Sequence, residues 1–85
     1  MGFYRVNYIH GDYFEGDYHE IGIYADLEKA FLKADEFIKE NTFYFNKYEH
    51  LLVEEYELVT DEYKVSNSWL KNDETNWEWE EEESE

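Results

Sequence analysis

Acidic side chains are the residues of this sequence whose number and spacing could do chemistry. The chain carries 23 Asp and Glu against 7 Lys and Arg in 85 residues, a formal net charge of −16. Because like charges repel one another in a compact fold, so large an excess indicates either a need for solubility alone or a basic surface as the binding target. Which of the two applies depends on where the carboxylates lie in the chain.

Regularly spaced acids occur in two segments that we expect to be folded. On a strand, Glu55 and Glu57 would lie on one face about 6.6 Å apart. A rigid fold with such rows could offer a DNA-binding protein an array of charge resembling phosphates. The alternative is that these acids are solvated positions of a half-buried strand and helix. The predicted binding residues here are Asp35, Glu36, Glu40, Glu54, Glu55 and Glu57.

The stretch from Asn72 to Glu85 holds eight acidic residues and no basic one. Residues 1–71 carry 15 acidic and 7 basic residues, so the acidity is not confined to a tail. Exposed Trp is a favoured anchor in interfaces, and flanking acids would steer it towards a basic rim. The alternative is that one Trp folds back onto the sheet edge of its own domain. The predicted binding residues are Trp77, Glu78, Trp79 and Glu80.

Histidines and acids also gather near the first predicted turn. If the chain turned between positions 14 and 15, His10 would face His19 and Asp12 would face Asp17, with Glu15 nearby. Such a set could chelate a divalent ion, but its spacing is not that of an EF-hand, and acids in turns are normally hydrated. We therefore predict no metal site.

Motifs for catalysis or phosphate binding are missing from the sequence. The three serines lie outside any nucleophile elbow, and there is no Cys, phosphate loop, dinucleotide fingerprint or His-Glu-x-x-His pair. Arg5 is the only arginine, so phosphate contacts would have to overcome the field of the whole chain. We predict no enzyme activity, no cofactor and no direct binding of nucleic acid.

The length predicts one small domain over residues 1–71, and the order of the elements described below places it in the α+β class. The acidic stretch over residues 72–85 is predicted to be a disordered tail. No apolar signal segment and no stretch near 18 apolar residues occurs. An anionic membrane surface would also repel the chain. We therefore expect a cytoplasmic protein that does not bind membranes.

Periodicity predicts the elements. Residues 3–10 and 18–24 alternate as strands and should form an antiparallel hairpin, because the seven residues between them have a turn composition. Residues 51–59 alternate as a third strand, and residues 63–69 could form a short fourth strand or a segment that crosses the sheet. In either case we expect Trp69 to pack on the body. The predicted order is β-β-α-β with an optional fourth strand, in an antiparallel or mixed sheet.

The predicted helix begins after Asp26, whose carboxylate can cap free backbone N–H groups. Apolar residues follow at helical spacing, Asp35 is placed to pair with Lys39, and Asn41 is a plausible stop. The apolar residues at helical spacing are Leu27, Ala30, Phe31, Ala34, Phe37 and Ile38. The segment Thr42–His50 has no clear period, and one interpretation is that it caps the open edge of the helix.

The stretch Ile21-Gly22-Ile23-Tyr24-Ala25-Asp26-Leu27-Glu28-Lys29-Ala30, with the later Tyr56-Glu57-Leu58, resembles small bacterial and phage proteins of unknown function. The likeness covers residues 3–60 and implies a β-β-α-β core with one helix. It implies no activity, and the acidic stretch after Trp69 departs from that pattern. In size and charge, the chain also resembles phage-encoded DNA-mimic inhibitors as a class.

The leading hypothesis is a non-enzymatic module that occupies a basic, nucleic-acid-binding surface of another protein and blocks it. A phage or mobile-element origin would suit that role. The second hypothesis is a small cytosolic domain that forms homodimers or larger homo-oligomers through its aromatic sheet face, with the acidic tail serving solubility. A charged complex should weaken steeply with salt, whereas an aromatic homodimer should not.

Overall fold

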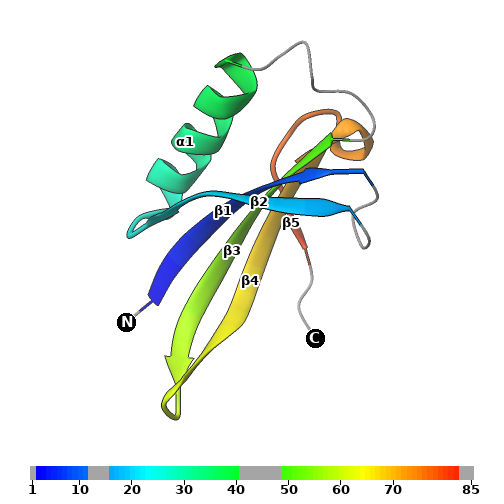
Figure 1. The fold of residues 1–85 in the computed structure, drawn as a ribbon. Helices are drawn as coiled ribbons and strands as arrows, with labels where there is room; N and C mark the ends of the chain where they lie inside the picture. The colour runs from blue at the N-terminus through cyan, green and yellow to red at the C-terminus, as the bar shows by residue number, and fades with distance from the viewer. Residues whose placement is uncertain (1, 12–15, 41–48, 83–85) are drawn as a thin grey trace.

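The computed structural model describes residues 2–11, 16–40 and 49–82. Figure 1 shows one twisted sheet with helix α1 (Leu27–Glu40) lying across one of its faces. The strands, with the 3₁₀ helix η2 between the last two, are β1 (Gly2–His10), β2 (Asp17–Tyr24), β3 (Glu49–Val59), β4 (Glu62–Asn72), η2 (Asp73–Thr75) and β5 (Glu80–Glu82). The sheet order is β2-β1-β3-β4-β5, and all neighbouring strands are antiparallel.

The predicted α+β class, with one helix on one face of a small sheet, is confirmed. The predicted strand count was too low, because the described residues form a sheet of five strands. The fourth strand extends to 11 residues because β4 pairs with β3 along its whole length. As far as Glu82, the C-terminal stretch also differs from the expected disordered tail, since β5 pairs with Ser68–Leu70 of β4.

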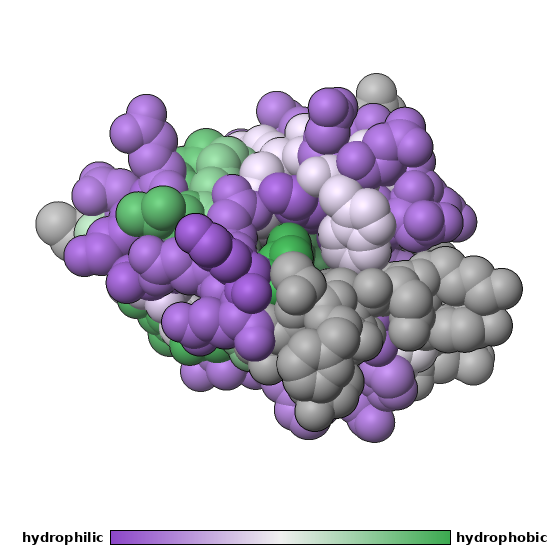
Figure 2. All heavy atoms as spheres, turned by 90° about the horizontal axis from the view of Figure 1, so that it is seen from above, coloured by the Kyte–Doolittle hydropathy of each residue, from purple (hydrophilic) through white to green (hydrophobic). Residues whose placement is uncertain are grey.

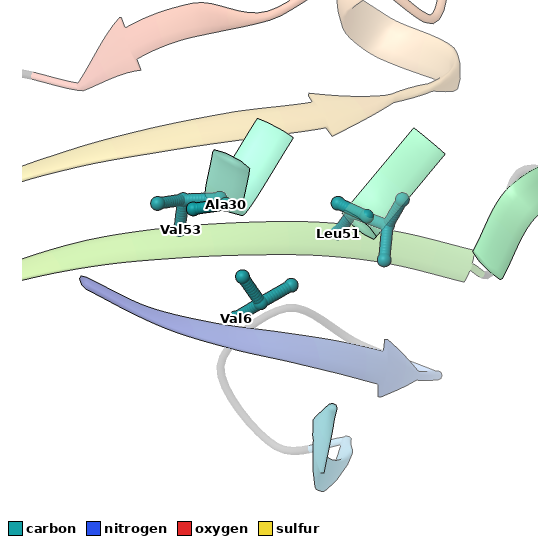
Figure 3. Close-up of a cluster of buried hydrophobic side chains, with 5 residues drawn as sticks. Val6, Ala30, Leu51 and Val53 are labelled. Atoms are coloured by element: carbon teal, nitrogen blue, oxygen red, sulfur yellow. The ribbon is translucent and has the colours of Figure 1, made fainter. Parts of the chain in front are cut away.

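Helix α1 can approach the sheet closely because two small residues, Ala30 and Ala34, face it and are fully buried. The helix begins where predicted, since the Ala30 N–H donates to the Asp26 carbonyl at 3.0 Å. Val6 of β1 and Leu51 and Val53 of β3 complete the core under the helix (Figure 3). Within the described residues, no helix has the length and apolar character needed to cross a bilayer.

The opposite sheet face carries a second, smaller apolar cluster. Ile9, Leu52 and Leu70 are buried there, one from each of three neighbouring strands. Residues 51–59 alternate between the two faces, as predicted: Val53 packs under α1, and Leu52 lies on the other side. We refer to the side under α1 as the covered face and to the other side as the open face.

The register of the first hairpin differs from the prediction. His10 pairs with Asp17, and His19 lies opposite Tyr8 rather than opposite His10. The register shifts between Val6 and Asn7, which a strict alternation of residues could not reveal. Positions 12 and 15, also part of the considered metal set, lie outside the described residues.

Only the last two residues of the segment Thr42–His50 lie within the described part of the chain. Glu49 and His50 are the first residues of β3, because they pair with His10 and Ile9 of β1. The rest of that segment, like the predicted stop at Asn41, lies outside the described residues; the helix is described to Glu40.

The hairpin of β3 and β4 projects beyond the rest of the sheet (Figure 1). The last pair between β1 and β3 is Gly2 with Glu57, so β3 continues with β4 as its only paired strand among the described residues. The hairpin turns through Thr60 and Asp61, whose φ angles of 48° and 65° lie in the left-handed region. This region is unfavourable for a β-branched residue such as Thr.

Candidate functional site

The described end of the C-terminal stretch, Asp73–Glu82, forms an acidic strap along the edge of the sheet. It contains six acidic residues and no basic one. Asn72 caps η2 with a side-chain oxygen that accepts from the Thr75 N–H at 3.0 Å. Asn76 and Trp77 then adopt left-handed φ angles of 57° and 58°, after which the chain runs back antiparallel to β4 as β5.

Trp79 fastens the strap to the body. Its ring stacks on Phe31 of α1 at 4.7 Å between centroids, and the Lys71 ammonium lies 5.5 Å from the Trp79 centroid. The predicted packing of Trp69 is confirmed, because this ring meets Phe31 edge-on at 5.9 Å. Trp79 therefore matches the second interpretation considered from the sequence, a Trp folded back onto its own domain, while Trp77 is half-buried.

A polar network ties the start of the strap to β3. The His50 ring Nδ1 accepts from the Asn72 side-chain amide at 3.0 Å, and its Nε2–H donates to the Gly11 carbonyl at 2.9 Å. The orientation of the Asn72 side-chain amide is fixed, because its oxygen already accepts a hydrogen bond from the Thr75 N–H. The strap is thus positioned by side chains from α1, β3 and β4.

The strap presents its charge outward. Five of its acids are exposed, and Glu82 is half-buried. Glu80 and Glu82 lie on one side of β5, about 6.6 Å apart by strand geometry. Figure 2 looks onto the end where α1 finishes and η2 lies, and most of the described surface there is hydrophilic. The exposed acids are Asp73, Glu74, Glu78, Glu80 and Glu81.

The predicted acids of α1 are partly neutralised within the molecule. Asp35 accepts from Lys71 of β4 at 2.7 Å, so the partner that the structure shows is Lys71 and not Lys39. Glu36 pairs with Lys33 at 3.3 Å. Glu40 is exposed, as is Glu57 on β3. The structure therefore does not join all the predicted acids into one continuous row.

Glu55 is held by three hydrogen bonds. Its carboxylate accepts from the Asn67 amide at 2.8 Å, from the Tyr4 hydroxyl at 3.0 Å and from the Ser66 hydroxyl at 3.2 Å. The bond from Asn67, followed by those from Tyr4 and Ser66, lowers the pKa of Glu55 despite partial burial. This carboxylate is charged but already engaged.

Glu54 is the neighbour of Glu55 and lies on the open face. Its carboxylate accepts from the Asn7 amide at 3.1 Å and is half-buried. Burial raises the pKa of Glu54, and the nearby Arg5 charge opposes that shift. Arg5 itself is paired with Glu20 at 2.9 Å.

Sequence reasoning missed a buried carboxylate, Glu49, which is 2% exposed at the start of β3. It accepts from the Tyr8 hydroxyl and contacts His10 Nδ1 at 2.8 Å. Burial and the bond to Glu49 raise the pKa of Tyr8 to about 12, and the bond to Glu49 raises the pKa of His10. The available signal was its position two residues before Leu51, on the buried side of the same strand.

The cluster of Glu49, Tyr8 and His10 links β1 to β3, and the Glu49 carboxylate is already hydrogen-bonded within it. In the described parts of the chain, no group of three or more His, Asp or Glu side chains is arranged to hold a metal ion. The exposed charge of the strap is therefore the arrangement with the clearest binding chemistry. Comparison with protein-family models, curated proteins and solved structures found no match, so the surface must be interpreted from its own geometry.

Proposed function

We propose that the chain is a non-enzymatic protein-binding module that occupies a basic, nucleic-acid-binding surface of a partner protein by charge mimicry. The observation that supports this best is the acidic strap, whose six acids have no basic residue among them. Because β5 and Trp79 hold the strap against the sheet, binding would cost less conformational entropy than it would for a free tail.

The predicted acids would contribute unequally. Glu78 and Glu80 on the strap, and Glu40 and Glu57 on the body, are exposed and can face a partner. Asp35 and Glu36 are paired with lysines of the chain itself and would contribute less. The long-range field from a net charge of −16 would steer a basic partner to the surface at an increased association rate.

A second candidate is self-association through the open face in a cytosolic protein, with the strap serving solubility. It is favoured by half-exposed apolar side chains on that face, Leu58 at 50% and Tyr63 at 55%. A phage or mobile-element origin suits the first candidate and is neutral towards the second. Because electrostatic complexes weaken with salt and apolar ones do not, ionic strength separates the two.

The test captures partners of the purified chain from its native host at about 50 mM salt and elutes them at about 200 mM. A retained nucleic-acid-binding protein should be displaced from the chain by duplex DNA. The variant Glu78→Gln/Glu80→Gln should lose most of the capture, whereas the matched variant Asp17→Asn/Glu28→Gln, which removes the same charge elsewhere, should retain it. Equal capture by both variants would show that the strap is not the binding surface.

A further inference from the structure

The acidic strap, Asp73–Glu82, is held to the body by a short strand and one aromatic ring. Among the described residues, β5 pairs with β4 over Ser68–Leu70, at the edge of the sheet (Figure 1). Trp79 adds an apolar contact through its stack on Phe31. Elements with few buried apolar contacts open locally at a lower free-energy cost than the core of the same protein. The strap should therefore open more readily than the rest of the sheet.

Two features of the strap oppose its docking on the sheet. The Trp79 indole Nε1–H is buried and has no hydrogen-bond acceptor among the described residues. A buried N–H without an acceptor costs free energy, which contact with water would recover. Asn76 and Trp77, which lead into β5, hold φ angles of 57° and 58°. The left-handed region is unfavourable for a bulky residue such as Trp, so opening of the strap would also relieve backbone strain.

Net charge opposes docking as well. The strap carries six acids and no base, whereas residues 1–71 carry 15 acids against 7 bases, a net charge of −8. The pairing of β5 therefore brings a segment with six negative charges onto a body of the same sign. Self-repulsion of this kind works against a compact state.

The sheet also places one pair of like charges in the same row. Glu82 pairs with Ser68, and Ser68 pairs with Glu54. The two carboxylates therefore share the open face, about 9.6 Å apart by the spacing of two strands. Arg5 pairs with Glu54 from the other side but forms an ion pair with Glu20 at 2.9 Å. A separation of this size is close to the Debye length at about 0.1 M salt, so dissolved ions weaken the repulsion.

The attraction that holds the strap lies in a less exposed place. The Lys71 ammonium lies 5.5 Å from the Trp79 ring centroid and donates to Asp35 at 2.7 Å. The Lys71 side chain is 16% exposed. Salt screens partly buried charges much less than exposed ones. Added salt should therefore weaken the repulsion more than the attraction and shift the strap towards the docked state.

We infer that the strap is a reversible closure whose docked state is favoured by positive charge around its acids, supplied by salt or by a bound partner. For the partner this inference rests on the proposed function, to which it adds a form of regulation. Lysine or arginine side chains that bind the strap would also remove the repulsion that opens it, so docking and binding would strengthen one another. Salt would act in opposite directions, promoting closure of the isolated chain and weakening the complex.

Hydrogen exchange of the Trp79 indole Nε1–H, followed by NMR on the full chain, measures the opening, because this N–H is buried when the strap is docked. Its signal is identified by its absence from Trp79→Phe, which keeps a ring against Phe31. Between about 20 mM and about 500 mM NaCl, the exchange should slow by about threefold or more. A lysine pentapeptide added at the lower salt concentration should slow it too, at a far lower concentration than NaCl.

Two matched variants test whether the charge of β5 causes the effect. Glu80→Gln/Glu82→Gln should exchange slowly at both salt concentrations, because it removes the repulsion. Asp17→Asn/Glu28→Gln removes the same charge away from the strap and should keep the salt dependence of the unmodified chain. Circular dichroism checks the fold, and Glu82→Gln alone replaces the double variant if that variant unfolds.

Protection of the Trp79 indole equal to that of the β3 backbone amides would overturn the inference, because the strap would then open only when the whole chain unfolds. Exchange that salt leaves unchanged or accelerates would overturn it too. Neither result bears on the proposed function, which depends on the capture of a partner. If salt slows the exchange but the lysine pentapeptide neither binds nor slows it, closure by salt is supported, while the coupling to a partner fails together with the proposed function.

Discussion

The two faces of the sheet show how one alternating strand can serve two purposes. On the covered face Val6, Leu51 and Val53 are fully buried, whereas on the open face of the same β3 strand Leu58 is half-exposed. Helix α1 has 14 residues and spans about 21 Å, while the molecule is 42 Å long. On the covered face the helix is therefore too short to reach the hairpin end, and on the open face no helix of the described residues lies over Leu58.

Shortening one leucine on each face should give the largest difference in the free energy of unfolding between the two faces. Leu51→Ala would leave a cavity under α1 and lower the free energy of unfolding by about 2–5 kcal/mol. Leu58→Ala should change it by less than about 0.5 kcal/mol, because the side chain is half in solvent. Urea unfolding of both variants measures the difference. Similar losses would mean that the hairpin end is packed as tightly as the core.

Glu54 and Glu55 are neighbouring carboxylates that lie on opposite faces of the sheet, so replacing each one in turn compares the two faces. Glu55→Gln should lower the free energy of unfolding by about 1–2 kcal/mol, because three hydrogen bonds to the charged group are weakened or lost. Glu54→Gln should be neutral or slightly stabilising near pH 7, since it removes a half-buried charge and can still accept from Asn7. Chemical denaturation of both variants provides the test, and an equal loss in the two would contradict it.

Substitutions in the turn of the projecting hairpin should raise the free energy of unfolding. Thr60→Asn with Asp61→Gly places the residues that favour left-handed φ angles at both positions. We expect a gain of about 1 kcal/mol in the free energy of unfolding, because backbone strain is relieved. Thermal melting measures the gain. An unchanged or lower melting temperature would show that the two native side chains make compensating contacts.

The pH dependence of stability should also follow Glu55. Its pKa is lower in the folded state than the ordinary value of 4.5, so its stabilising contribution is complete above that value. The contribution is lost as the pH falls through the lowered pKa, because the carboxyl then binds a proton in both states. The difference in melting temperature between the unmodified chain and Glu55→Gln should therefore shrink in acid. A difference that stays constant down to about pH 2 would contradict this assignment.

Local patterns predicted much of the fold. The helix begins after Asp26, and the cores of the first three strands lie where alternation placed them. The candidate site was less predictable. The exposure of Glu78 and Glu80 follows from their charge, but the pairing of Asp35 with Lys71 joins residues 36 positions apart. No helical spacing rule contains such a contact.

The sequence by itself determined the α+β class, the excess of negative charge and the two-sided character of the strands, because these depend on composition and on neighbours a few residues away. Only the tertiary structure decided the course of the acidic stretch as far as Glu82. Glu80–Glu82 has no local preference for a strand. It becomes one because the edge of β4 offers hydrogen bonds and Phe31 offers a surface for Trp79, and both are assembled only when α1 and β4 have packed.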